Sequence, residues 1–416
     1  MTIFYLIEWV MQGGGKLPDI KKVWNFGMRA KPRFIAGDFT IIEGTPTNSL
    51  EVAYDKVFGT MTDNVLLLDN MLIYLHFCVD FRTEERGAHH DHVQITLEID
   101  GENFVLDLTL NKQLLPKGFF YKHQENGKHK IKRPTTEEVE LCQYNGKVRG
   151  KPDSWVALST CNGLSGVIFD GIEMHYIEKD MKSIEGGLDV PHFLYKHSDL
   201  EEHNKTCGYG GDAYKRDADE NELLVRGPYN ANKESKYVEL VLVIDNQEFK
   251  ELGESNTRVY NHAKTLANII NGLYSPLNIF IALVGVVIWN EQDEINFSPN
   301  GDTTLTNFLH YRREKLIKQH PNDNAQLLTK FNFDNGVVGK ALKGPICTYE
   351  YSGGVNTDHS SVVGLVATTV AHEMGHNFDK LELNVSTLEW DMQLSKLNNS
   401  KLPTEIFSMR LPDWRL

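Results

Sequence analysis

Hydrophobic and polar residues alternate along much of the chain between residues 90 and 180. In the run 92–110 the alternation continues on both sides of Asp100-Gly101, which predicts a β-hairpin with a tight turn. The polar and basic stretch 122–134 that follows is predicted to be a loop. Further strand-like runs indicate that this part is one β-rich domain, and they lie at 139–148, 154–161 and 166–178.

Beyond residue 235 the pattern changes to apolar strands separated by segments with helical periodicity. Helical spacing is present at 258–274 and 304–317, and strand-like runs lie at 236–245, 279–289 and 324–333. Strands that alternate with helices are typical of an α/β layer. The segment 196–233 is rich in charged residues and glycine and poor in aliphatic residues, so we expect a connector between the two parts.

Length and charge narrow the function classes. A chain of 416 residues has room for two or three domains, and 41% hydrophobic with 24% charged residues is ordinary for a folded protein. A formal net charge of -14 disfavours binding to nucleic acid or anionic lipid, because both are negatively charged. No uninterrupted apolar run reaches the ~18 residues of a membrane-spanning helix. Glu8 interrupts the apolar N-terminus, so no clear signal peptide is expected either.

The strongest chemical signal lies in the helically spaced segment 360–378, which contains His372-Glu373-Met374-Gly375-His376. Two histidines four residues apart share one face of a helix, so both imidazoles can bind one Zn²⁺. Glu373 lies between them, where a carboxylate can take a proton from a zinc-activated water and later return it. A five-residue pattern also arises on helices by chance, so the surrounding sequence decides between the two interpretations.

The residues around this motif, GPICTYEYSGGVNTDHSSVVGLVATTVAHEMGHNF, resemble the reprolysin or adamalysin branch of the metzincins, the ADAM proteases, and most closely their meltrin-like subgroup. The resemblance begins near His92 and continues through KYVELVLVIDNQEF, WNEQDEI and NDNAQLL to Phe378. It implies an α/β metzincin-type catalytic domain, truncated, preceded by a β-rich pro-domain. The expected division is 1–85 unassigned, 86–195 pro-domain, 196–233 connector, 234–378 incomplete protease domain and 379–416 a tail without family resemblance.

The resemblance implies the zymogen of a zinc endopeptidase that cleaves protein or peptide substrates. It also implies passage through the secretory pathway to the cell surface or the extracellular space. His372 and His376 would be ligands of one catalytic zinc ion, and Glu373 the catalytic base. Cys207, in HNKTCGYGG, matches the cysteine switch, whose thiolate fills the open zinc position in such zymogens.

Two further features follow from the same resemblance. Cys142 and Cys161 match the disulfide of the family's pro-domain, and closing a loop of that size would stabilise a secreted domain by ~3 kcal/mol. Glu239 and Asp323 match the early ligands of a calcium site, whose late ligands would lie beyond Phe378. Calcium is therefore a second expected metal, at an incomplete site.

The chain departs from the family pattern after His376. The family has a glycine and then a third histidine where this chain has Asp379 and Glu382. Glu382 could be the third zinc ligand, because two histidines and one glutamate form a catalytic set elsewhere. Asp379 would instead lie on the face of His376 if the helix continued. No Met-turn follows, and no cysteine follows Cys347, whose family counterpart normally pairs with a later one.

These departures share one boundary, Phe378. We expect the residues after it to derive from a different exon, a read-through or a gene-model error that replaces the end of the catalytic domain. Two hypotheses on function stay open: a catalytically active zymogen, and a non-catalytic pro-domain or pseudoprotease fragment that binds proteins without cleaving them. Bound zinc and cleavage of peptides would distinguish them.

Overall fold

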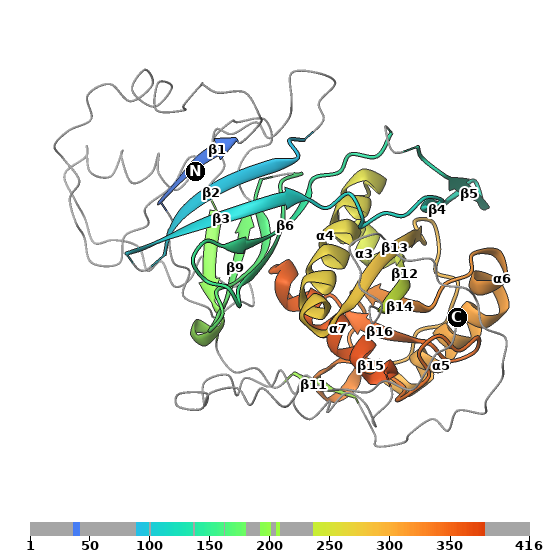
Figure 1. The fold of residues 1–416 in the computed structure, drawn as a ribbon. Coiled ribbons are helices and arrows are strands. Elements are labelled where there is room, and N and C mark those ends of the chain that lie inside the picture. Colours follow the sequence, from blue (N-terminus) through green and yellow to red (C-terminus); the bar gives the residue numbers. More distant parts are fainter. Residues whose placement is uncertain are drawn as a thin grey trace, which may run out of the picture.

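The computed structural model describes residues 36–41, 89–179 except 100, 136–137 and 162, then 192–200, 205–208 and 236–378. Within these ranges the chain forms two eight-stranded sheets. The helices α4 (Asn256–Tyr274) and α7 (Val363–Asn377) lie between the two sheets (Figure 1). A β-rich part followed by an α/β part, as the sequence predicts, is therefore confirmed.

The first sheet is antiparallel throughout, with the order β1-β2-β3-β6-β7-β8-β9-β10. Its predicted hairpin is present, and Gly101 takes a φ of 78° in the turn. The three predicted strand-like runs also form strands. The strands are β1 (Ala36–Ile41), β2 (His92–Ile99), β3 (Glu102–Leu110), β6 (Gln143–Val148), β7 (Trp155–Ser159), β8 (Ser165–Phe169), β9 (Met174–Lys179) and β10 (His192–Lys196).

The second sheet has the order β11-β15-β16-β14-β12-β13-β4-β5. Its pairs are parallel except β15 with β16 and β4 with β5. The strands are β4 (Phe120–Glu125), β5 (Lys128–Lys132), β11 (Thr206–Cys207), β12 (Lys236–Ile244), β13 (Ile279–Ile288), β14 (Asn324–Thr329), β15 (Val337–Ala341) and β16 (Gly353–Thr357). All three predicted strands of the α/β part are therefore present, at β12, β13 and β14.

Helices cover both faces of the second sheet. Leu240 and Leu242 of β12 pack with α4 and α7, whereas Val241 and Val243 pack on the opposite face with α5 (Gly301–Tyr311). Burial on both faces explains the unbroken apolar sequence of β12. The remaining helical segments are η2 (His197–Asp199), α3 (Asn246–Glu251), η3 (Ser275–Leu277), the π-helical η4 (Arg312–Leu316), α6 (Ile317–Gln319) and η5 (Asp334–Gly336).

The prediction of a loop at 122–134 is wrong, because this stretch contains most of the hairpin β4–β5. Asn126 and Gly127 have φ of 52° and 70°, as the tight turn of a two-residue hairpin requires. The residues of β5 are all exposed at the edge of the sheet, so no hydrophobic alternation marks them in the sequence. The hairpin also joins the second sheet, beside β13, and not the sheet of its neighbours in sequence.

One hydrophobic core spans the two parts of the chain. Trp155, Ala157 and Tyr176 of the first sheet belong to the same buried cluster as Leu266 and Ile270 of α4. A second cluster lies wholly within the first sheet, and a third lies between the second sheet and α5. The two sheets therefore share buried apolar surface through α4 and α7.

Candidate metal centre

The helix α7 presents the histidine pair on its polar side. Its apolar residues Val366, Val370 and Met374 are buried in the core that it shares with α4. The end of the helix is fixed by neighbouring backbone, because Gly344 N donates to His376 O at 2.9 Å. Asn377 is buried and donates to Leu342 O at 2.9 Å. Ile346 N donates to Asn377 O at 2.8 Å, so this bond and that of Gly344 satisfy two carbonyl groups that the helix end leaves open, and the Asn377 side chain anchors the same end.

Four potential metal ligands converge at this place. His372 Nε2 and His376 Nε2 are 3.0 Å apart, and Cys207 Sγ is 3.2 Å from His376 Nε2. The ligand atoms of Cys207, His372, Glu373 and His376 all lie within 4.8 Å of one another. The structure therefore brings together the two histidines, the carboxylate and the cysteine, which are up to 169 residues apart in sequence.

Cys207 reaches this place because the strand β11 adds to the edge strand β15. Cys207 pairs with Gly339 in a parallel register, and Gly208 N donates to Gly339 O at 2.9 Å. Lys340 Nζ donates to Gly208 O and also forms an ion pair with Asp302 at 2.7 Å. The thiol is thus positioned by backbone pairing on the strand that borders the metal centre.

Glu373 is packed tightly beneath this strand. Its side chain contacts Gly339, where a Cβ would lie 2.5 Å from Glu373 Oε1, so a larger residue at that position would displace the Glu373 side chain. Burial raises the pKa of Glu373 to about 8, against the opposing effects of a hydrogen bond from Cys207 and the nearby charge of Lys340. A carboxyl group with a pKa near neutrality can both accept and donate a proton at physiological pH.

The donors fit a zinc ion. Burial lowers the pKa of His376 to about 4, with smaller effects from His372 and Lys343, so its imidazole is neutral and its ring nitrogen can bind a metal. In tetrahedral zinc sites ligand nitrogens lie about 3.3 Å apart and a nitrogen lies about 3.6 Å from a sulfur. The 3.0 Å and 3.2 Å separations found here need only small adjustments.

The other predicted site residues have different positions. Glu239 and Asp323 lie together, since Glu239 N donates to Asp323 Oδ2 at 2.8 Å, and burial raises the pKa of both carboxyl groups. Among the described residues, no third histidine, cysteine or carboxylate forms a metal-ligand cluster with this pair. The calcium site stays a prediction. Asp379 and Glu382 lie outside the described residues.

The predicted disulfide between Cys142 and Cys161 is present, with Cα atoms 5.2 Å apart. Cys142 directly precedes β6 and Cys161 follows β7, so the disulfide joins the neighbouring ends of these two paired strands. Several residues near the centre had no signal in the sequence, among them Gly339 and Lys340. Their roles depend on pairing between β11 and β15, two strands that are more than 120 residues apart, so no local pattern could reveal them.

A histidine pair and a carboxylate on a helix beneath a largely parallel sheet define a metallopeptidase type of site. The reprolysin (M12B) family zinc metalloprotease model matches residues 236–383, and the reprolysin family propeptide model matches residues 74–149. The chain therefore belongs to the reprolysin family and is of the ADAM type. The two matches begin before residue 86 and end after Phe378, so the family resemblance is somewhat longer than the sequence analysis suggests.

Individual relatives agree with this assignment. Disintegrin and metalloproteinase domain-containing protein 15 from Homo sapiens is 34% identical over 291 residues, which are 68% of this chain and 33% of that protein. The protein of the same name from Rattus norvegicus is 34% identical over 292 residues, with coverage of 68% and 33%. Zinc metalloproteinase-disintegrin-like BmMP from Bungarus multicinctus is 34% identical over 302 residues, with coverage of 71% and 48%. The chain thus spans a third to a half of these relatives.

No helix within the described ranges is long and apolar enough to cross a membrane.

Proposed function

We propose that the chain is the latched pro-form of a zinc endopeptidase that cleaves peptide bonds in protein substrates. The observation that carries this proposal is the convergence of two imidazole nitrogens and the Cys207 sulfur at 3.0 Å and 3.2 Å, directly beside Glu373. Nitrogen and sulfur are the donors that zinc prefers in proteins. The membership of the reprolysin family supports the same chemistry.

In this function His372 and His376 hold the zinc ion and Cys207 occupies the position that a substrate needs. Zinc, when bound, supplies Lewis-acid polarisation of the peptide carbonyl and makes water more acidic. Glu373 accepts the proton of the attacking water and returns it to the leaving amine. Its position beside both imidazoles and the Cys207 sulfur supports this role.

Substrate would bind where β11 now lies. β11 pairs with β15 through backbone hydrogen bonds, so it occupies the edge of the second sheet next to the metal centre. An extended peptide could use the same edge once β11 has left, which is the β-augmentation mode of peptide recognition. The disulfide between Cys142 and Cys161 supports a route through the oxidising secretory pathway.

One observation favours a second candidate function, a non-catalytic pseudoprotease fragment. The metal-ligand cluster within the described residues obtains its third zinc donor from Cys207, the latch itself. If neither Glu382 nor Asp379 binds zinc, departure of Cys207 leaves two imidazoles, and a catalytic zinc site normally has three protein ligands. Such a chain would bind zinc while latched and would not cleave peptides after opening.

Metal analysis and a peptide-cleavage assay test both functions. We expect the purified chain to contain one zinc ion, and the Cys207→Ala variant to cleave peptides unless Glu373→Ala is added. A wild-type chain without zinc would contradict the latched endopeptidase and support a non-catalytic chain. A Cys207→Ala variant that loses its zinc supports the fragment, and Glu382→Ala and Asp379→Ala then identify any third ligand.

A further inference from the structure

The last strand of the second sheet carries a run of positive charge. β5 ends the strand order of this sheet, and Figure 1 shows it at the outer end of the hairpin β4–β5, far from the first sheet. Residues 128–133, with the sequence KHKIKR, contain four lysines and arginines and no carboxylate, and all six are exposed. The whole chain has a formal net charge of -14, so this run is opposite in sign to the rest of the molecule.

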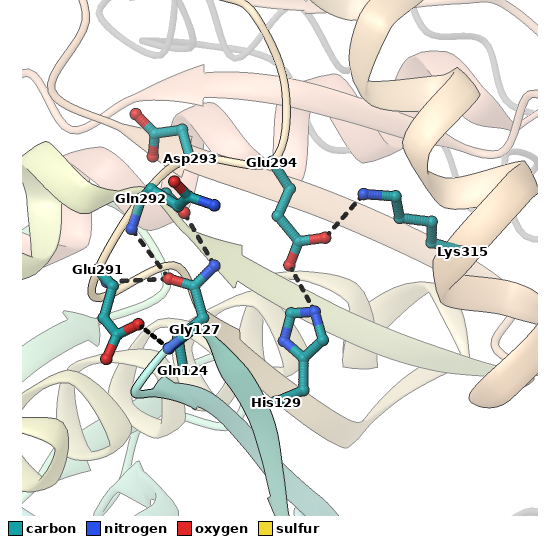
Figure 2. A pocket seen from close by; sticks show the side chains of 8 residues that line it. All are labelled: Gln124, Gly127, His129, Glu291, Gln292, Asp293, Glu294 and Lys315. Carbon is teal, nitrogen blue, oxygen red and sulfur yellow. Dashed lines mark hydrogen bonds and ion pairs between the residues drawn. The ribbon is translucent and has the colours of Figure 1, made fainter.

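Three of these cations form a straight row, the lysine ridge, which consists of Lys128, Lys130 and Lys132. Side chains alternate between the two faces of a strand, so the ridge lies on one face of β5 and His129 on the other. Figure 2 shows His129 directed at Glu294, with His129 Nε2 3.4 Å from Glu294 Oε1. The ridge therefore points away from Glu294 and its acidic neighbours at 291 and 293.

The spacing of the ridge suits a linear polyanion. A strand rises about 3.4 Å per residue, so alternate lysines are about 7 Å apart. This spacing is shorter than the distance of about 8 Å over which charges act at physiological salt. The three ammonium groups can therefore act together on one chain of negative charges.

Further cations surround the hairpin. The pKa of His320 falls to about 4, chiefly through burial and then through the charges of Lys122 and Arg133. Burial and then the charge of Lys122 also lower the pKa of His129, with a smaller contribution from Lys315 and against the effect of Glu294. Two histidines on different elements thus lie in a positive field around β4 and β5.

The ridge lysines have only exposed ion-pair partners. Lys130 pairs with Glu125, and Lys132 Nζ lies 3.7 Å from Glu138 Oε1. The four side chains are between 44% and 61% exposed, and ion pairs in water are weak. A polyanion can therefore replace these carboxylates. Lysines on an edge strand also prevent the addition of further strands, and that role alone would give no affinity for polyanions.

We propose that the lysine ridge of β5 binds a sulfated polysaccharide chain of the glycosaminoglycan type. Short runs rich in lysine and arginine are typical of heparin-binding surfaces. A thin polymer can contact the ridge alone, whereas a flat anionic membrane or a DNA duplex would also approach the acidic loop 291–294 and the remaining negative surface. Binding needs neither zinc nor catalysis. It rests on the proposed secretory route, which brings the chain to places where such polymers occur.

The test titrates a fluorescently labelled heparin oligosaccharide with the purified full chain and follows its anisotropy at several salt concentrations. We expect saturable binding that weakens as salt rises. A ridge variant should bind at least about 10-fold more weakly, since each cation beside an anionic surface changes affinity about 5-fold. The slope of log Kd against log salt should fall by up to about 3, one for each lysine. The ridge variant is Lys128→Gln, Lys130→Gln and Lys132→Gln combined.

Controls separate the ridge from general charge. Arginine at the same three positions keeps the charge and should keep the affinity. A matched variant loses three exposed cations from the first sheet and should change the affinity less than about 2-fold, because these cations lie outside the ridge. Heparin without its sulfate groups should bind at least about 10-fold more weakly than heparin. The matched variant is Lys112→Gln, Lys147→Gln and Arg149→Gln combined.

A second measurement needs no variant and covers the case in which the ridge variant aggregates. Heparin should protect the ridge lysines of the wild type from acetylation and leave Lys112 unprotected, as mass spectrometry of the peptides would show. Absence of this protection would overturn the proposal. The same holds for an unchanged affinity in the ridge variant, an equal loss in the matched variant, or tighter binding to phosphatidylserine vesicles or duplex DNA than to heparin. Loss of zinc or of peptidase activity would contradict the proposed function and leave the heparin result intact, so the two failures are distinguishable.

Discussion

Pro-domain or connector residues occupy both edges of the second sheet, but in different ways. At the β15 edge, β11 adds two residues and places one sulfur atom against the metal centre. At the β13 edge, the hairpin adds strands of six and five residues and inserts Phe120 into the core. The first contact depends on the chemistry of one thiol, whereas the second depends on volume and hydrogen bonds. The two edges therefore depend on different kinds of contact.

Removing the Phe120 ring should give the largest effect and act on the β13 edge alone. Phe120 is 4% exposed, and deletion of a buried phenylalanine ring costs about 3–5 kcal/mol of unfolding free energy. Urea unfolding of Phe120→Ala measures this loss. Ile131→Ala is the control, because Ile131 lies in the same hairpin but is 42% exposed, and it should change stability by less than about 0.5 kcal/mol. Equal effects of the two variants would contradict the packing argument.

Removing a histidine should act on the other edge alone. We expect His372→Ala to weaken zinc binding at least about 100-fold, since a direct ligand matters no less than the partners that orient it. Competition with a chelator measures the affinity. The hairpin β4–β5 should stay in place in this variant, because the contacts of Phe120 and Gln124 do not involve the histidine pair. A loss of unfolding free energy in His372→Ala as large as that in Phe120→Ala would show that the two edges are coupled.

The two edges also differ in how far the sequence predicts them. The histidine pair and Glu373 could be predicted because the helical repeat fixes their relative positions, and β12 and β13 because burial on both faces leaves unbroken apolar runs. The hairpin β4–β5 could not be predicted, since every residue of β5 is exposed. The hairpin is held in the sheet by pairing with β13, which is about 150 residues away in sequence. A two-residue strand such as β11 has no pattern of its own.

Lys264 offers a pH-dependent test of the contact between α4 and the segment before β6, where Lys264 Nζ donates to Glu140 O at 2.6 Å. Burial lowers its pKa from 10.5 to about 8, against the raising effect of Glu140. Between these two pH values the unfolded chain binds more protons than the folded chain, so the free energy of unfolding rises with pH. Below pH 8 Lys264 is charged in both states, and the full cost of burying its charge lowers the stability. We expect the free energy of unfolding to rise by at most about 3 kcal/mol between pH 8 and pH 10.5.

Denaturant unfolding across this pH range measures the gain, and Lys264→Met should remove it because the variant has no titrating group. Lys112→Met is the control, since the Lys112 side chain is 59% exposed and forms a surface ion pair with Asp91. An identical pH slope in the wild type and Lys264→Met would show that Lys264 titrates normally and that water reaches its contact with Glu140.

The smallest expected effect concerns a hydrogen bond between the first sheet and the start of α7. Glu178 of β9 accepts a hydrogen bond from Val363 N at 2.8 Å, and α7 has no N-cap side chain of its own. Glu178→Ala should therefore cost about 1 kcal/mol of unfolding free energy, as loss of a helix cap does. Ser255→Ala is the control, because Ser255 caps α4 from within the protease domain.

A second experiment uses the protease domain alone, after the chain is cut between the two domains and the pro-domain is removed under mild denaturant. In this piece Ser255→Ala should still be destabilising. Glu178 is absent from that piece, so hydrogen exchange at the first turn of α7 should become faster than in the complex. Unchanged exchange there would mean that α7 begins without help from the pro-domain, and that the two edges meet only through the sheet.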